Sequence, residues 1–416
     1  MSSVVDIIDS GLCLRCGACV SLCPRGAAAA AWDAEEGWRV LVNRETCNEC
    51  GNCVPVCPGG GIDFDHYARL FHLGGNRMEL IGRYDELLSG WAADWTTRWL
   101  GSSGGVGTAL VEAALEEGIA DAALLTSCGG DRGLVLSATH VYAPAGVSEA
   151  AGSRYLMLPL AASLREVETS GLRYVVVGLP CHIQGVRLLQ ERSPVLRANI
   201  VGTVSLLCGM VQTPGAVVRA LRRSGLTLGS GDSLLRMRGR GWPGTVQVKR
   251  ADGSTANANY RGFYDARFQS EILRRCRWCP DATGILADIS LGDAWPARGA
   301  PASGLGESLI VVRGPRGRAL VECARDRLVL TKRTAQEFRD SQAHLWRLKQ
   351  RIVPALIAAA RHAGARVPEY PGVGTSVRTM DFFAAAVWEA KRRYRTSRHA
   401  GTSRRRYVCL RTDSSA

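Results

Sequence analysis

Residues 13–24 read CLRCGACVSLCP and residues 47–58 read CNECGNCVPVCP, so one cysteine pattern, C-x2-C-x2-C-x3-C-P, occurs twice near the start of the chain. Three closely spaced thiolates can wrap one cubane cluster, while the proline turns the fourth cysteine away. In two-cluster ferredoxins of this pattern the fourth cysteine ligates the other cluster. The sequence therefore predicts two [4Fe–4S] clusters in a bacterial-type ferredoxin domain.

The predicted ligand sets are crossed between the two runs. They are Cys13, Cys16, Cys19 and Cys57 for one cluster, and Cys47, Cys50, Cys53 and Cys23 for the other. Gly17 and Gly51 leave room for backbone N–H groups near the cluster sulfurs. A pair of zinc sites is the alternative, because C-x2-C also suits zinc. Two identical runs that both end in proline favour the clusters.

The composition is that of a soluble globular protein with more than one core. The chain has 416 residues, of which 46% are hydrophobic, and no apolar run approaches the roughly 18–20 residues that span a bilayer. The N-terminus lacks the features of a signal peptide, so we expect a cytoplasmic protein. Fifteen cysteines in a reducing compartment indicate metal binding rather than disulfides.

Beyond the cysteine runs the pattern predicts an α/β fold. Short β-branched runs such as 173–178 and 198–207 are typical of buried parallel strands, and helical patterns such as 214–223 alternate with them. Thr334 and Glu337 form a predicted capping box before a long helical region. The predicted domains are a ferredoxin domain (1–65), a connector (66–100), the two parts of an α/β domain (101–170 and 171–332), a helical extension (333–395) and a disordered basic tail (396–416).

Four further cysteines suggest a third metal site. Cys181 directly follows the predicted strand 173–178, and Cys208 follows the predicted strand 198–207. Ligands gather outside the carboxyl ends of parallel strands, where Cys276 and Cys279 of a C-x2-C-P segment could complete four ligands. Spacing alone leaves open a third [4Fe–4S] cluster or ordinary buried cysteines.

A glycine-rich segment, SSGGVGT at 102–108, precedes a predicted helix, an arrangement that suits phosphate binding. It is neither a dinucleotide fingerprint nor a Walker loop, because the required glycine spacing and the Gly-Lys-Ser/Thr are missing. A simple turn and helix cap is the alternative interpretation.

The motifs in order resemble a known family. After the ferredoxin pair come SSGG (102–105), AGSRY (151–155), VGLPCHIQG (177–185), LLCG (206–209), RGW (240–242), CRWCP (276–280) and ADISLGDAW (287–295). Over roughly residues 1–330 the chain resembles the coenzyme F420 hydrogenase/dehydrogenase beta-subunit family of flavin- and iron–sulfur-containing oxidoreductases. One departure is Leu179-Pro180-Cys181-His182, where the family usually has Thr-Pro-Cys-Gln.

The resemblance implies one FAD per chain and a [4Fe–4S] cluster within the flavin domain. It favours the third cluster, with Cys181, Cys208, Cys276 and Cys279 as ligands. The flavin contacts that it implies are Ser103, Gly104, Gly105 and Thr108 of the loop, and Pro180 of the Pro-Cys motif. His182 is the candidate catalytic proton relay, with a packing or hydrogen-bonding role as its alternative.

These parts predict an oxidoreductase that moves electrons between a hydride-carrying coenzyme, the deazaflavin F420, and a one-electron partner protein such as a ferredoxin or another redox subunit. Two alternatives remain open: a ferredoxin-dependent reductase of an organic substrate, and a non-catalytic polyferredoxin-type carrier. Residues 391–416 carry nine Lys and Arg and one acid, Asp413. This basic end could dock an acidic partner, but we expect no nucleic-acid partner and no membrane span.

Overall fold

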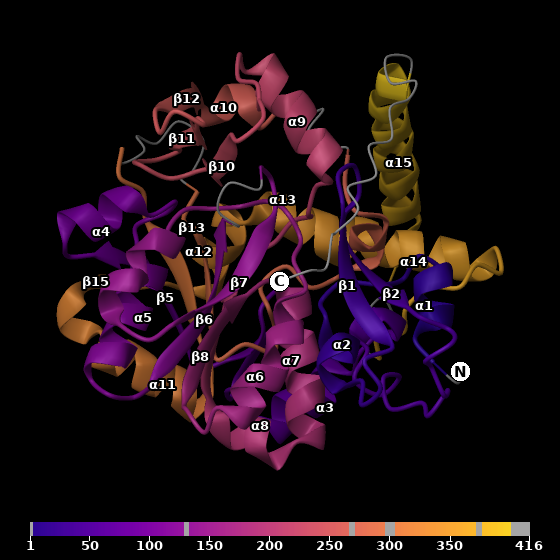
Figure 1. Cartoon of the computed structure of the whole chain (residues 1–416), viewed down its shortest axis with the longest axis horizontal. Helices are drawn as coiled ribbons and strands as arrows, with labels where there is room; N and C mark the ends of the chain where they lie inside the picture. Colours follow the sequence, from indigo (N-terminus) through magenta and orange to yellow (C-terminus); the bar gives the residue numbers. More distant parts are fainter. Residues whose placement is uncertain (1–2, 129–132, 266–270, 296–303, 372–376, 401–416) are drawn as a thin grey trace.

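An eight-stranded sheet forms the centre of the computed structural model, which describes residues 3–128, 133–265, 271–295, 304–371 and 377–400 (Figure 1). The strand order is β15-β5-β14-β13-β9-β8-β6-β7. β13, β9, β8 and β6 are mutually parallel, and antiparallel strands flank them on both sides. The strands of this sheet are β5 (Glu86–Ala92), β6 (Ala122–Cys128), β7 (Leu136–Val141), β8 (Tyr174–Gly178), β9 (Ile200–Leu206), β13 (Ile289–Asp293), β14 (Ser308–Val312) and β15 (Leu328–Lys332).

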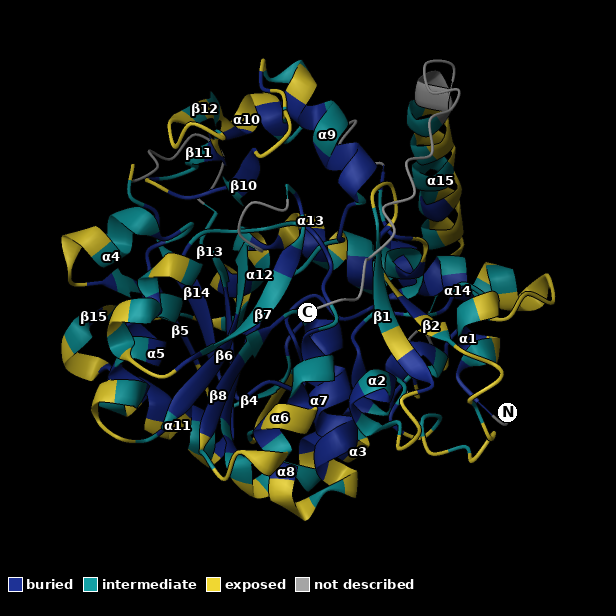
Figure 2. Cartoon of the chain, in the orientation of Figure 1, coloured by how far each residue is buried: buried dark blue, intermediate teal, exposed yellow. Residues whose placement is uncertain are grey.

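Helices cover both faces of the sheet, and the side-chain alternation of the strands divides the core accordingly. In β8, Val175 packs in the core with the residues of α5 and α11, whereas Tyr174 and Val176 pack in the core with those of α7. Figure 2 shows the central strands as largely buried. These helices are α5 (Val106–Glu116), α11 (Gly314–Cys323), α6 (Leu164–Thr169), α7 (Pro180–Arg192) and α8 (Pro194–Asn199).

The ferredoxin-type unit packs against the α7 side of the larger domain. The Ala161 N–H donates to the Cys16 carbonyl at 2.8 Å, so the first cysteine loop is attached to the turn η4 (Leu160–Ser163). Gly17 has φ +91°, and a Cβ there would lie 2.7 Å from the Pro159 carbonyl oxygen and from the Ala162 nitrogen. The unit comprises α1 (Val5–Asp9), α2 (Ala18–Leu22), η1 (Pro58–Gly60) and the antiparallel hairpin of β1 (Ala28–Asp33) and β2 (Gly37–Val42).

Smaller elements surround this framework. Along the chain, α3 (Phe64–Leu70), β3 (Asn76–Met78) and β4 (Gly82–Tyr84) follow the ferredoxin unit and precede β5. Helix α4 (Trp95–Leu100) follows β5. The chain between β9 and β13 contains a three-stranded sheet of β10 (Ser233–Arg236), β11 (Thr245–Lys249) and β12 (Thr255–Asn259). The helices of this segment are α9 (Pro214–Arg223), α10 (Tyr260–Phe263) and η6 (Arg274–Trp278). The C-terminal region contains α12 (Ala335–Ser341), α13 (Ala343–Arg347), the π-helical turn η8 (Leu348–Ile352), α14 (Val353–His362) and α15 (Thr379–Ala400).

The predicted α/β fold behind a ferredoxin-type unit is confirmed. The stretch 66–100, predicted as a connector, contains β5, which lies inside the sheet between β15 and β14. The predicted tail begins within α15, which continues to Ala400, and residues 401–416 lie outside the described residues. Within the described ranges, no helix combines the length and apolar character that crossing a bilayer requires.

Candidate functional site

The outer cysteine set, defined as Cys47, Cys50, Cys53 and Cys23, lines one cavity at the surface of the ferredoxin unit. Cys50 is exposed. Burial raises the pKa of the Cys23 thiol, but hydrogen bonds from the backbone N–H groups of Ala28, Arg25, Ala27 and Gly26 outweigh it and lower that pKa overall. Backbone donors directed at a sulfur stabilise the thiolate, which is the form that ligates iron.

The inner cysteine set, defined as Cys13, Cys16, Cys19 and Cys57, lies deeper. Cys16 and Cys19 are buried. Burial raises the pKa of Cys57 to about 12, and the nearby Cys13 thiolate adds to this shift although it comes from the other run. Buried thiolates that repel one another require a cationic core, which an iron–sulfur cluster supplies. The donor chemistry of this set therefore fits a cluster.

The third cysteine set, defined as Cys181, Cys208, Cys276 and Cys279, also comes together. Cys181 lies in the first turn of α7, Cys208 follows β9, and the other two belong to η6 and the residue after it. Burial raises the pKa of Cys181 well above its usual value, and the other three thiolates of the set reinforce the shift. Apolar side chains surround the set, namely Leu14, Met157, Leu179, Val211 and Leu273.

Helix α7 connects the inner set to the third set. Cys181 lies at its start, and one turn later a Cβ on Gly185 would lie 3.3 Å from the Cys16 sulfur. Cys16 is also close enough to Cys181 to contribute to the raised pKa of that thiol, after burial and the other cysteines of the third set. The two sets are thus neighbours across one helix.

A cleft of about 210 Å³ lies at the carboxyl ends of the parallel strands. Its floor is apolar and includes Val177 of β8, Leu206 of β9 and Leu291 of β13. Ser103, Gly105 and Thr108 line its rim. Leu207 also lines the cleft and directly precedes Cys208, so the cleft and the third set meet at one backbone segment.

The loop at the rim is shaped by its glycines. Gly104 and Gly105 have φ +89° and +74°, a left-handed conformation that glycine adopts without strain. The Ala92 N–H of β5 donates to the Gly104 carbonyl at 2.7 Å, which fixes the loop to the sheet. An apolar floor beneath a polar, glycine-rich rim fits a planar ring system with polar edges and phosphates, such as FAD.

Three of the predicted contact residues do not line the cleft, namely Gly104, Pro180 and His182. His182 is 1% exposed, and both its ring nitrogens contact the backbone: Nδ1 accepts from the Leu179 N–H at 3.1 Å, and Nε2 donates to the Leu158 carbonyl at 2.9 Å. Burial lowers its pKa to about 4. This geometry favours the hydrogen-bonding role, and the proton relay stays a prediction.

Two cations at the site, Arg238 and Lys349, had no sequence signal of their own. Arg238 lines the cleft, and its Nη1 donates to Asp293 Oδ2 at 2.6 Å, while the indole of Trp242 donates to Oδ1 of the same carboxylate at 3.0 Å. Buried Lys349 donates to the Cys279 carbonyl at 3.0 Å. Asp293 lies in the ADISLGDAW motif, but only folding brings these cations to it and to the cysteines.

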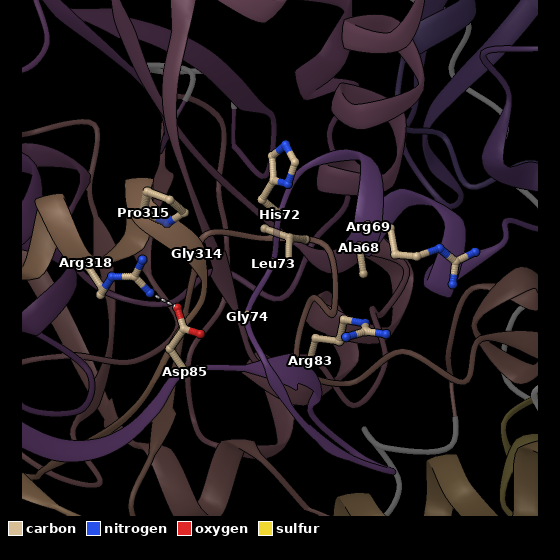
Figure 3. Close-up of a pocket in the computed structure, with 10 residues that line it drawn as sticks. All are labelled: Ala68, Arg69, His72, Leu73, Gly74, Arg83, Asp85, Gly314, Pro315 and Arg318. Atoms are coloured by element: carbon tan, nitrogen blue, oxygen red, sulfur yellow. Dashed lines mark hydrogen bonds and ion pairs between the residues drawn. The ribbon is translucent and has the colours of Figure 1, made fainter.

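A different cavity of about 430 Å³ lies at the end of the strands opposite the cleft, where β14 ends and α11 begins (Figure 3). It is lined by Arg69, Arg83 and Arg318, and Arg318 points to Asp85, with which it forms an ion pair. None of the predicted site residues lines this cavity.

The cysteine sets, the cleft and the sheet define an iron–sulfur oxidoreductase in which a ferredoxin unit is joined to an α/β domain. A family model of the 4Fe-4S dicluster domain matches residues 5–59. Models of the coenzyme F420 hydrogenase/dehydrogenase beta subunit match residues 87–165 for its N-terminal part and 171–337 for its C-terminal part. The chain belongs to this beta-subunit family and is an oxidoreductase.

Individual relatives agree with this assignment. The coenzyme F420 hydrogenase subunit beta of Methanosarcina barkeri is 26% identical over 227 residues, which cover 52% of this chain and 74% of the relative. The coenzyme F420-dependent sulfite reductase of Methanocaldococcus jannaschii is 25% identical over 330 residues, 76% of this chain but only 46% of the relative. A chain of the F420-reducing [NiFe] hydrogenase complex of Methanosarcina barkeri has a similar fold, with a TM-score of 0.55 at 20% identity, covering 71% of this chain and 99% of the other.

Proposed function

We propose that this chain is an iron–sulfur flavoprotein that moves electrons between the hydride carrier F420 and a one-electron protein partner. In this proposal FAD occupies the cleft, and the outer, inner and third cysteine sets each hold a [4Fe–4S] cluster. A flavin exchanges electrons in pairs or singly, and such clusters take them one at a time.

The contiguity of the sites carries the proposal. The cleft is linked to the third set through the consecutive residues Leu207 and Cys208, and α7 joins the third set to the inner set through Cys181 and Gly185. The outer set completes the row at the surface, where Cys50 is exposed. A row that begins in a cleft and ends at the surface is the arrangement that a hydride carrier at one end and a protein at the other require.

The side chains of the chain have separate tasks in this arrangement. The apolar floor of the cleft excludes water from the ring that it would hold, and the Ser103 loop would bind polar or phosphate groups at the rim. The Arg238–Asp293 ion pair forms a fixed wall of the cleft. Apolar residues around the third set, such as Met157 and Val211, separate that set from solvent.

The test begins with anaerobic purification and reconstitution with iron and sulfide. About twelve irons and about one FAD per chain are expected. Stopped-flow mixing with reduced F420, NADH and NADPH in parallel should bleach the flavin with reduced F420 alone.

The other outcomes would each point to a different function. A loaded flavin that none of the three carriers bleaches would favour the ferredoxin-dependent reductase of an organic substrate. Eight irons without flavin would leave the polyferredoxin-type carrier. Bound zinc without visible absorbance would contradict the proposal altogether.

A further inference from the structure

We propose that Arg275 is a buried cation shared by the inner and third cysteine sets, and that it raises the reduction potentials of the clusters that these two sets would hold. The inference rests on the proposed function in that both sets must carry clusters. It adds to that function a residue that tunes the reduction potentials of the clusters in the inner and third sets.

The surroundings of Arg275 are unusual for a charged side chain. The residue is 2% exposed and directly precedes Cys276 in η6. Its Nη2 donates to the Tyr370 hydroxyl at 2.6 Å, but its buried Nε and Nη1 have no hydrogen-bond partner. Buried charged donors are costly to leave unpaired. Two unpaired donors therefore indicate an acceptor that belongs to a bound group.

Backbone and side-chain contacts place Arg275 near both cysteine sets: it directly precedes Cys276, and Glu369, next to its partner Tyr370, is hydrogen-bonded to Gly60 and Ile62, which follow Cys57 closely. Burial raises the pKa of Cys13 and Cys57 in the inner set, and the charge of Arg275 acts on both in the opposite sense. In the third set, the thiolates of Cys276 and Cys279 are among the groups that act on Arg275 itself. Cluster sulfurs bound by these cysteines are acceptors of the kind that the free donors require.

The orientation of Arg275 is set by the C-terminal region. The ring of Tyr370 stacks on Phe64, with centroids 5.6 Å apart and an interplanar angle of 4°. Beside it, the backbone of Glu369 accepts from the Ile62 N–H and donates to the Gly60 carbonyl. Tyr370 lies beyond the residues that match the beta-subunit models, which end at 337. The support for the guanidinium therefore comes from outside the matched domain.

A second buried cation provides a useful contrast. Lys349 has an acceptor in the Cys279 carbonyl, and its charge acts on Cys208 and Cys276 of the third set. Arg275 differs because it retains free donors and because its charge acts on cysteines of both sets. Since a fixed positive charge in a low-dielectric interior favours the reduced, more negative state, neutralising Arg275 should make two clusters harder to reduce.

The test is a potentiometric titration of the reconstituted full-length protein, followed by electron paramagnetic resonance. In Arg275→Gln, two of the three one-electron reduction steps should shift to lower potential. The equilibrium constant for reduction should fall about tenfold in each, which corresponds to 59 mV. The step of the outer cluster should not move. Arg275→Lys should retain most of the wild-type potentials because the charge remains.

The matched control is Arg274→Gln, which removes the neighbouring but exposed arginine and should leave all three steps within about twofold. The proposal is overturned if Arg275→Gln behaves like Arg274→Gln, or if the outer step moves as much as the others. Should Arg275→Gln lose its iron, Arg275→Lys decides: retained iron and potentials support the proposal, and their loss overturns it. Failure of wild-type protein to bind iron would instead contradict the proposed function.

Discussion

The cysteines of the outer set and of the other two sets differ most in exposure. Cys50 is exposed, whereas Cys16, Cys19 and Cys181 are buried. An exposed ligand can be replaced without opening a packed core, so the outer set is the one whose loss should leave the remaining sites intact.

Cys50→Ser and Cys53→Ser together should remove one cluster. The expected iron content falls from about twelve to about eight per chain, because each cubane contains four irons. Iron analysis and the paramagnetic signal of the reduced protein measure this. Cys323→Ser, at a half-buried cysteine outside the three sets, should keep full iron content. An unchanged signal in the double variant would contradict the assignment of the outer set.

A buried ion pair beneath the site supports a second prediction at this scale. Arg187 is fully buried, and its Nη2 lies 3.0 Å from Asp288 Oδ2. Asp288→Asn leaves the guanidinium without its counter-ion, so the free energy of unfolding should fall by about 3–5 kcal/mol. Denaturant titration measures the loss. Asp121→Asn, at the exposed pair with Arg173, should change stability little, and equal losses in the two variants would refute the argument.

The cysteine sets are predictions that rest on local spacing. The crossed pairing comes from known motif geometry, whereas strand ends left the third set open and only the family resemblance favoured it. Arg275 and Lys349 could not be predicted, since an isolated arginine or lysine looks like a solvated surface charge. Their importance depends on packing between distant segments: Lys349 is 70 residues from its acceptor on Cys279.

At the scale of elements, prediction was accurate where the pattern was regular. Helix α9 occupies Pro214–Arg223 as predicted, and the capping box of Thr334 and Glu337 is present at the start of α12. β5 was missed because it lies between two neighbours in the sheet and four consecutive residues, 87–90, are buried, so it shows no alternation. The single long helix predicted after Thr334 is interrupted at Gln342, whose side chain instead donates to the Asp293 carbonyl at 2.6 Å.

The contact between the first cysteine loop, which contains Gly17, and η4 supports a prediction about how these elements pack. Gly17→Ala places a Cβ against the backbone of Pro159 and Ala162 and also strains a left-handed residue. The expected loss of stability is about 2–4 kcal/mol. Thermal unfolding and limited proteolysis measure the loss and the release of the unit.

Gly26→Ala is the control for the strain alone. Gly26 has φ +62°, and its Cβ would meet nothing within 4 Å. It should cost only about 1–2 kcal/mol. Equal effects of the two substitutions would mean that the contact with η4 does not hold the ferredoxin unit in place.

For the whole molecule, the core of the ferredoxin unit should depend on bound metal, whereas the cores of the large sheet depend on apolar packing. The ferredoxin unit is small and its core includes several cysteines of the inner and outer sets, whereas the large sheet has extensive apolar cores on both faces. Iron removal by a chelator should therefore release α1, α2 and the β1–β2 hairpin, because metal binding and folding are coupled in such units. Hydrogen exchange should show lost protection there and retained protection in β8 and β9. Uniform loss across the chain would contradict this division.

The backbone pairing of Gly61 with Glu369 joins the ferredoxin unit to the C-terminal region. During synthesis the ferredoxin unit emerges before the C-terminal region, and this clasp cannot close until more than 300 residues later. The nascent unit thus remains accessible to the machinery that delivers iron and sulfide for most of translation. Closure of the clasp then attaches the unit to the C-terminal region.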